Sequence, residues 1–328
     1  MDTISGKKIL LFCPWGTTVH YGQGIVHELE KRGATVVAYD ERPSQGTAMK
    51  IVIRLLKKKL PVLFLRYIER IVRQHPVVFD YVFVIRGEAF TVDAVNYLRH
   101  AYPQACFILY LWDILKTTNV KECIPYFDKV FSFDPVDAGT FPNMVFRPTF
   151  YLDCFKEVAS SSPGNVGITF IGTLHSNRFE ILQRIGKHLE KNGMNYYFYY
   201  FLPSRLVYLR DFFLNKQQPR YGDLHFESLS LTDILGKMRE SRCMLDLKYP
   251  AQLSLSMRAF EALAAKRKYI TNNPEIRNYD FYRPANILVI DEKQPDIPAE
   301  FVYTPFEDVP EEICRKYSLE GWIDVVFE

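Results

Sequence analysis

The sequence predicts an α/β protein built from two Rossmann-like halves, and three observations carry this prediction. The 328 residues exceed the usual size of one compact core, so two domains are expected. Short apolar runs alternate with helical patterns in both halves, which is typical of a parallel sheet with helices on both faces. A segment rich in Ser, Pro and Gly at 153–167 interrupts the alternation and indicates a linker.

The first half is expected to form an N-terminal domain over residues 1–155. It begins with a strand in 7–15 and a helix over 22–33, which ends at Gly33 because glycine suits a helix C-terminus. A long basic helical region runs from about 48 to 74. Further strands are predicted at 34–40, 80–90, 105–113 and 128–134, with a helix at 92–101.

The second half is expected to form a domain over residues 165–309 by the same alternation. Its strands are predicted at 166–174, 194–203, 243–250, 268–271 and 286–291, and its helices at 179–193, 231–242 and 256–265. Ser230 or Thr232 is a candidate cap for the second of these helices. Tandem halves of this kind predict a ligand cleft between the domains, at the carboxyl ends of both sheets.

Composition and charge narrow the functional classes. The net charge of +3 is too small to indicate a nucleic-acid partner, since no recognition motif accompanies it. The six cysteines are dispersed and form no C-x-x-C pair, so buried reduced thiols are expected. With no signal peptide and no apolar run of ~18 residues, we expect a cytoplasmic protein whose membrane contact would be peripheral.

The missing motifs exclude several enzyme classes. The run "YGQGIV" lacks the third glycine of G-x-G-x-x-G, and no phosphate-binding G-x-x-x-x-G-K-[ST] loop occurs. Neither G-x-S-x-G nor H-E-x-x-H is present. Because there is also no D-x-D pair and no metal-ligand spacing of histidines, neither a metal nor another cofactor is expected.

One stretch combines the residue types that bind a nucleoside diphosphate. A strand ends at Asp246 and a helix opens around Ser256, where unpaired N–H groups favour phosphate. Lys248 and Arg258 would add cationic donors, and Glu261 would accept hydrogen bonds from sugar hydroxyls. The alternative is that Arg258 and Glu261 form an exposed i,i+3 pair worth a few tenths of a kcal/mol.

This stretch also carries a family resemblance. The run "YPAQLSLSMRAFEALAAKRKYITNNPEIRNYDFYRPANILVID" resembles two-domain (GT-B) glycosyltransferases, in particular bacterial members of capsule and lipopolysaccharide loci, and is similar to the CgeB-like spore-maturation group. The runs "YFDKVFSFDPVDAGTF" and "FIGTLHSNR" extend the resemblance over both domains. It implies that Glu261 contacts the donor ribose, that Arg258 contacts the phosphates, and that segment 310–328 packs back on the first domain.

The resemblance further implies a glycine-containing loop at Gly172 and Thr173, facing the cleft with Arg178 nearby. One departure concerns the mechanism. Many retaining members carry two glutamates separated by seven residues, and the earlier position here is Leu253. The stereochemical outcome is therefore left open.

The catalytic base has three candidates. In an inverting enzyme, a carboxylate or a histidine of the first half would deprotonate the acceptor hydroxyl. Asp113 and Glu88 follow predicted strands, and His20 is expected in the loop after the first strand. A helix cap or loop anchor is the alternative role for Asp113, and Arg86 is an alternative partner for Glu88. A retaining enzyme would need no such base.

The basic region at 50–74 admits two interpretations. Eight lysines and arginines accompany a single acid, Glu69. The region would rest on an anionic leaflet with ~1 kcal/mol per basic residue near the surface. The alternative is a pair of ordinary domain helices broken at Pro61.

Together these features predict a metal-independent glycosyltransferase. It would move a sugar from a nucleotide-diphosphate donor to a glycan or lipid-linked acceptor in surface polysaccharide biosynthesis, in the cytoplasm or at the inner face of the membrane. A nucleotide-sugar epimerase or phosphorylase on the same fold is one alternative. A non-catalytic nucleotide- or glycan-binding protein is another, since Leu253 replaces a glutamate.

Overall fold

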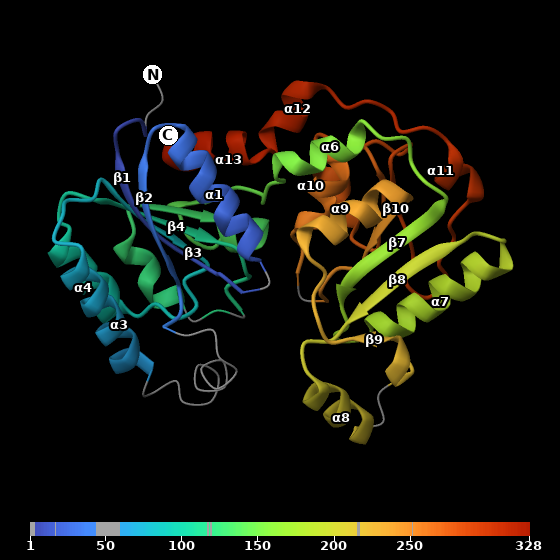
Figure 1. Cartoon of the computed structure of the whole chain (residues 1–328), viewed down its shortest axis with the longest axis horizontal. Helices are drawn as coiled ribbons and strands as arrows, with labels where there is room; N and C mark the ends of the chain where they lie inside the picture. Colours follow the sequence, from blue (N-terminus) through green and yellow to red (C-terminus); the bar gives the residue numbers. More distant parts are fainter. Residues whose placement is uncertain are drawn as a thin grey trace. The chain divides into compact units, whose positions relative to one another are not determined.

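The computed structural model describes residues 4–16, 18–43, 60–116, 118, 120–214, 217–250 and 252–328. The chain divides into two compact units (Figure 1). The first unit contains Met1–Pro148 and Leu319–Glu328, and the second contains Thr149–Ser318. The chain therefore leaves the first unit before the expected boundary at 155. Of the segment 310–328, only residues from 319 onward belong to the first unit.

The first unit is built on a parallel sheet with the strand order β2-β1-β3-β4-β5-β6. Its strands are β1 (Lys8–Cys13), β2 (Thr35–Asp40), β3 (Tyr81–Ile85), β4 (Cys106–Leu111), β5 (Lys129–Ser132) and β6 (Met144–Phe146). Every neighbouring pair is parallel, which confirms the expected sheet type. The sequence predicted the first five strands and missed β6, which is only three residues long.

Helices cover both faces of the first sheet (Figure 1). They are α1 (Val19–Lys31), α3 (Leu60–Gln74), α4 (Val92–Ala101), α5 (Pro135–Ala138), α13 (Leu319–Phe327) and the 3-10 segment η1 (Val120–Tyr126). On one face, Ile68 of α3 and Val95 of α4 join the buried cluster of strand side chains. On the other face, Trp322 of α13 packs edge-on against Tyr110 and lies against Phe83.

Helix α1 begins earlier than the sequence predicted and ends where expected. Gly33 has φ +87° and lies just after the helix, where its N–H bonds to Glu30 O and the N–H of Ala34 bonds to Leu29 O. This is the Schellman arrangement that favours glycine. Because α1 starts at Val19, His20 lies in its first turn, so its expected position in a loop is wrong.

The described part of the basic region forms α3, and its apolar side belongs to the core. Phe64, Ile68 and Ile71 are almost completely buried, while Arg66 and Arg70 point to the surface. Packing against the sheet therefore explains these three apolar residues, whereas Val62 and Leu63 near the start of the helix are exposed. Residues 50–59 of the predicted membrane-contact segment lie outside the described residues. None of the described helices is long and apolar enough to cross a membrane.

The second unit repeats the parallel architecture, with the strand order β12-β11-β10-β7-β8-β9. Its strands are β7 (Val166–Thr173), β8 (Tyr196–Phe201), β9 (Leu224–His225), β10 (Ser241–Asp246), β11 (Lys268–Thr271) and β12 (Ile287–Val289). Its α-helices are α6 (Lys156–Ala159), α7 (Arg178–Lys191), α8 (Arg205–Phe213), α9 (Leu231–Glu240), α10 (Met257–Ala264), α11 (Ala299–Tyr303) and α12 (Glu311–Lys316). Short 3-10 segments are η2 (Asp153–Phe155), η3 (Tyr221–Asp223) and η4 (Pro274–Asn278).

The helices of the second unit also lie on both faces of their sheet. Ile185 of α7 and Val302 of α11 share one buried cluster with the strands. Met238 of α9 and Phe260 of α10 are completely buried and do not belong to that cluster. The start of α9 is capped by Ser230 in a capping box with Asp233, which confirms one of the two expected caps.

The segment 153–167 is not a free linker. Phe155 and Val158 are fully buried in the second unit. A Cβ on Gly164 would lie 2.8 Å from Glu240 O, so the backbone passes too close to the end of α9 for any side chain. Close packing therefore explains Gly164, whereas Ser160, Ser162 and Pro163 are exposed.

Candidate active site

The carboxyl edge of the second sheet gathers most of the predicted donor-binding residues. In a parallel sheet the carboxyl ends of neighbouring strands meet at one edge, and here Asp246 of β10 stands in register with Thr271 of β11. Thr173 ends β7 at the same edge. The loop after β10 leads into α10, whose first residues are Met257 and Arg258.

The N-terminal end of α10 is not capped by its own N-cap side chain. Ser256 occupies the N-cap position with extended backbone angles, but its hydroxyl makes no capping bond. Instead it donates to Asp246 Oδ2 at 2.7 Å, and Tyr269 Oη donates to the same oxygen at 3.1 Å. The first N–H groups of α10 therefore have no bond from Ser256, and an anion could bind there.

Arg258 and Glu261 form a buried ion pair within α10. Only 4% of Glu261 is exposed, and burial raises the pKa of its carboxyl while lowering the pKa of Arg258. The charge of Asp246 works against the lowering of the pKa of Arg258. The exposed, weak pair considered as an alternative is therefore not what the structure contains.

Arg178 links the ends of β7 and β10 by hydrogen bonds. Its guanidinium donates to Thr173 O at 3.1 Å and also to Leu247 O, just beyond β10. Its Nε is buried and makes no hydrogen bond within the described residues. Burial lowers the pKa of Arg178, while the charge of Asp246 acts in the opposite direction.

Gly172 and Thr173 are the last residues of β7 rather than a loop, so the expected glycine-containing loop is wrong in this respect. They pair in register with Tyr200 and Phe201 of β8. A Cβ on Gly172 would lie 2.8 Å from the ring of Phe170, so packing explains the glycine.

Two asparagines hold the loop between β10 and α10. Asn272 accepts from the backbone N–H of Lys248 at 2.8 Å. Asn273 donates to the carbonyls of Leu253 at 3.0 Å and Ser254 at 3.2 Å. Lys248 is half-buried and forms no ion pair with the described residues, whereas 38% of Leu253 is exposed. Sequence reasoning missed both asparagines, although "NN" directly follows the strand predicted at 268–271.

The charges at this edge nearly balance. Arg178 and Arg258 both experience the field of Asp246, and Glu261 is paired with Arg258. Two cations thus face two carboxylates. The start of α10 and the ammonium group of Lys248 add the positive charge that would favour a diphosphate.

A second charged cluster lies at the carboxyl edge of the first sheet. Glu41 follows β2 and is fully buried, and its carboxylate accepts from the guanidinium of Arg86 and from the N–H of Glu88 at 2.9 Å. Arg42 pairs with Glu88. The main partner of Arg86 is therefore Glu41, while Glu88 lies 3.9 Å from its Nε.

The backbone at this cluster is strained. Arg86 has φ +71°, a left-handed conformation that disfavours residues with a side chain, and Gly87 follows with φ +70°. Burial raises the pKa of Glu41, with Arg86 opposing that rise. Sequence reasoning missed Glu41 and Arg42, and the signal available for them was the charged run directly after a predicted strand.

Asp113 lies beside this cluster, in the loop after β4. Burial raises the pKa of its carboxyl, whereas Arg86 works to lower it and Glu88 to raise it. Within the described residues, no hydrogen bond or ion pair occupies its carboxylate. Of the three candidate bases, Asp113 is therefore better suited to accept a proton than Glu88, which Arg42 already engages.

His20 lies near the same edge. Its ring is 4.3 Å from that of Tyr21, and Tyr21 packs edge-on against Trp112, the residue before Asp113. The candidates of the first unit thus share one edge of their sheet. Among the described residues, no group of three His, Cys, Asp or Glu side chains is arranged to hold a metal ion.

No family model matches the sequence, and no curated protein matches it significantly. Solved structures do match along almost the whole chain. An α-glucosyltransferase in complex with UDP and a 13-mer DNA gives a TM-score of 0.61 at 13% identity, covering 98% of this chain and 93% of that one. A lipopolysaccharide outer core galactosyltransferase gives 0.53 at 12% identity, covering 97% and 98%.

An epimerase is similar as well. A UDP-N-acetylglucosamine 2-epimerase from Listeria monocytogenes gives a TM-score of 0.51 at 13% identity, covering 88% of this chain and 85% of that one. At such identities the likeness concerns the fold and not the reaction. With its two six-stranded parallel sheets and interleaved helices, the chain has the GT-B fold.

Proposed function

We propose that this protein is a glycosyltransferase that uses a nucleotide-diphosphate sugar as its donor. One observation carries the proposal: Ser256 gives its hydroxyl to Asp246, so its side chain does not cap the start of α10. A helix start of this kind, with Arg258 in its first turn, provides N–H donors and positive charge for a diphosphate.

In this proposal, Arg258 and Lys248 hold the diphosphate together with the N–H groups of α10. Arg178, Gly172 and Thr173 border the same edge and support its geometry. Fixed positive charge stabilises the nucleoside diphosphate as it leaves, which is the work that a metal ion performs in other transferases. The reaction would then need no metal or other cofactor.

Glu261 has two possible roles toward the donor. The resemblance to GT-B transferases assigns it the ribose hydroxyls. Its 4% exposure means that such a contact requires a rearrangement on binding, whereas holding Arg258 in position requires none. The ribose contact remains our proposal, and separate titrations with a nucleoside and with its diphosphate distinguish the two roles.

The first unit would hold the acceptor and supply the base. A hydroxyl of the acceptor attacks the anomeric carbon of the donor, and Asp113 takes the proton of that hydroxyl. Asp113 suits this role because burial raises its pKa and no described residue occupies its carboxylate. Glu88 would raise the pKa of Asp113 further, and the neighbouring arginines would lower it. In a retaining reaction Asp113 would be dispensable.

A donor screen tests the proposed activity. The protein is incubated with UDP-, GDP-, CDP- and ADP-sugars, with and without a mixture of lipid-linked and oligosaccharide acceptors, and the products are separated by chromatography. The proposal predicts that one nucleoside diphosphate is released, faster with acceptor, together with a glycosylated acceptor. Absence of any release or transfer with all donors would contradict it.

A nucleotide-sugar epimerase is a second candidate, because an epimerase shares the fold at a TM-score of 0.51. An epimerase would change the sugar of its substrate with no acceptor present, and the same chromatography would detect that product. A non-catalytic binding protein would bind a nucleoside diphosphate and release nothing. This alternative is tested because Leu253, which is exposed, stands where many retaining family members carry a glutamate.

We further propose that the acceptor is a glycan or a lipid-linked glycan of a surface polysaccharide, as the resemblance to capsule and lipopolysaccharide enzymes implies. Peripheral contact with the inner face of the membrane would then use the basic surface of α3, where Arg66, Arg70 and Arg73 are exposed. Sedimentation with anionic vesicles should weaken when these three are replaced by glutamine. Unchanged sedimentation would contradict this contact.

A further inference from the structure

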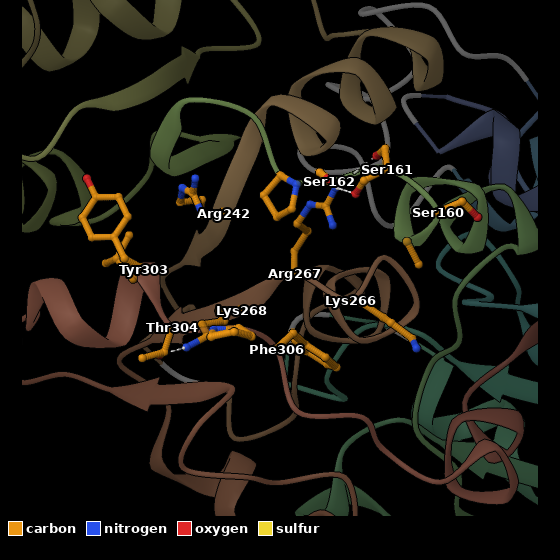
Figure 2. A pocket seen from close by; sticks show the side chains of 14 residues that line it. Ser160, Ser161, Ser162, Arg242, Lys266, Arg267, Lys268, Tyr303, Thr304 and Phe306 are labelled. Carbon is orange, nitrogen blue, oxygen red and sulfur yellow. Dashed lines mark hydrogen bonds between the residues drawn. The ribbon is translucent and has the colours of Figure 1, made fainter.

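A cavity of about 430 Å³ lies in the second unit, at the amino ends of its strands (Figure 2). Arg242 near the start of β10 and Lys268 at the start of β11 contribute to its lining. Segments 159–163 and 302–306 complete the wall. Along β10, Arg242 is about 13 Å from Asp246, at the rise of a parallel strand. The cavity is therefore separate from the proposed donor site, at the opposite edge of the same sheet.

Two buried cations of this wall have only neutral partners. Arg267, 2% exposed, donates to the carbonyls of Met238, Ala265, Val158 and Ser161. Lys268, 3% exposed, donates to Phe301 O at 2.6 Å and to Thr304 Oγ1 at 2.5 Å, as Figure 2 shows for the latter bond. No carboxylate of the described residues forms an ion pair with either. Hydrogen bonds to carbonyls satisfy the donors without forming an ion pair. Glu307 acts on Lys268 only through its electrostatic field, so part of the positive field of the two cations extends into the cavity.

Two further cations line the cavity and retain freedom to bind. Arg242 is half-buried, its guanidinium lies 5.4 Å from the ring centre of Tyr303, and it forms no ion pair with the described residues. Lys266 pairs with Asp308 at 2.5 Å, but both side chains are largely exposed. Such an exposed pair contributes little to stability, so a ligand can replace it at small cost.

The backbone at Lys266 is unusual. Lys266 has φ +49° and lies just after α10, where its N–H bonds to Leu263 O and the N–H of Arg267 bonds to Ala262 O. Glycine is the usual residue at this position of a Schellman motif. A lysine held here in a left-handed conformation costs of order 1 kcal/mol or more, and strain of this kind is typical of functional positions.

We propose that this cavity binds the phosphate group of a small phosphorylated molecule. Arg242 would contact the phosphate directly, while the more distant charge of Lys266 and the buried charges of Arg267 and Lys268 would attract it (Figure 2). The volume falls within the range of small-molecule sites, and Tyr303 and other apolar side chains offer a surface for the organic part of the ligand. The proposal does not depend on the glycosyltransferase function, because the site lies at the other edge of the sheet.

Calorimetric titration with inorganic pyrophosphate tests the site in the full-length protein, with UDP present in excess to occupy the proposed donor site. The informative variants are Arg242→Gln and Lys266→Gln, because Arg267 and Lys268 support the backbone and their replacement would disturb the fold. Lys191→Gln, an exposed lysine at the end of α7, is the matched control. Thermal unfolding of all variants should match that of the unchanged protein.

The unchanged protein should bind one pyrophosphate in the presence of UDP. Arg242→Gln should weaken this binding about tenfold, since a hydrogen bond to a charged group contributes roughly 1.5–3 kcal/mol. Lys266→Gln removes a more distant charge and should weaken it less, and Lys191→Gln should leave it unchanged. Absence of binding, or equal binding by all variants, would overturn the proposal. If only the proposed donor site is wrong, UDP does not bind, but Arg242→Gln still weakens the binding of pyrophosphate.

A second arm identifies the source of the phosphate. Vesicles of phosphatidylcholine with and without phosphatidic acid are sedimented with the unchanged protein and with Arg242→Gln. Binding to phosphatidic acid that Arg242→Gln weakens assigns a lipid headgroup. Pyrophosphate binding without vesicle binding assigns a soluble phosphorylated molecule.

Discussion

At the scale of single residues, Asp113 is the group whose protonation should control the reaction. Its pKa is raised by burial, and a base must lose its proton before it can act. Activity should therefore fall as the pH drops, with a midpoint above the ~3.9 of an ordinary aspartate. Asp113→Asn should lower kcat by roughly 10²–10⁴ and abolish this acid limb.

Asp93→Asn provides the control for that experiment, because Asp93 is an exposed residue in the first turn of α4. It should leave the pH profile of kcat unchanged. An Asp113→Asn variant with full activity and the original profile would remove Asp113 from the mechanism and favour a retaining reaction.

Glu261 offers a second test at this scale, which separates its two proposed roles. If its carboxylate contacts the ribose, Glu261→Gln weakens the binding of uridine, or of the nucleoside whose diphosphate binds, by about tenfold. If it only positions Arg258, the same substitution weakens diphosphate binding and leaves nucleoside binding unchanged. Calorimetry with the nucleoside and with its diphosphate distinguishes these results. If Glu261→Gln binds both ligands as tightly as the unchanged protein, Glu261 does not belong to the site.

The same residues mark the limit of what sequence could predict. Arg258 and Glu261, three positions apart in a helix, predicted that the two side chains meet. Their burial could not be predicted, because it depends on the packing of α10 in the second unit. Similarly, Glu41 pairs with Arg86 across 45 positions of sequence, and no local pattern reveals such a contact.

At the scale of elements, one arginine supplies the side-chain hydrogen bonds that fix the middle of the segment 153–167. Arg267 donates to carbonyls on both sides of Ser160, so it ties this segment to the end of α10. Arg267→Met would leave several buried carbonyls without donors and should lower the free energy of unfolding by at least ~3 kcal/mol. Urea denaturation measures this loss.

Arg239→Met is the matched control, since Arg239 is exposed and lies 3.9 Å from Glu157. It should change the free energy of unfolding by ~1 kcal/mol or less. Equal stability of both variants would mean that Arg267 does not hold the segment. Faster proteolysis within 159–163 in Arg267→Met alone would locate the loss.

Helices and strands could be predicted where apolar residues recur along the sequence at the spacing of a buried strand or of one helix face. Long apolar strands such as β4 and β7 and the amphipathic helices α7 and α9 followed directly from their patterns. The short β6 and β9 were missed, since three and two residues cannot display an alternation. The segment predicted as a linker belongs to the second unit instead, because Phe155 and Val158 are buried there and Gly164 packs against the end of α9.

At the scale of the whole molecule, two features define the architecture. Each unit is built on one parallel sheet, and the last ten residues of the chain belong to the first unit. Alternating strands and helices in both halves predicted the paired sheets. Solved enzymes with 12–13% identity share the fold, and at such identities the likeness concerns the fold alone. The reaction therefore has to be argued from the site.

The most direct test of the central claim is a calorimetric titration of the full-length protein with UDP, GDP, CDP and ADP. The proposed donor site predicts that one of them binds with a stoichiometry of one. Arg258→Ala should weaken that binding at least tenfold, while Lys191→Gln should not change it. If none of the four binds, or if Arg258→Ala binds as tightly as the unchanged protein, the start of α10 is not a nucleotide site.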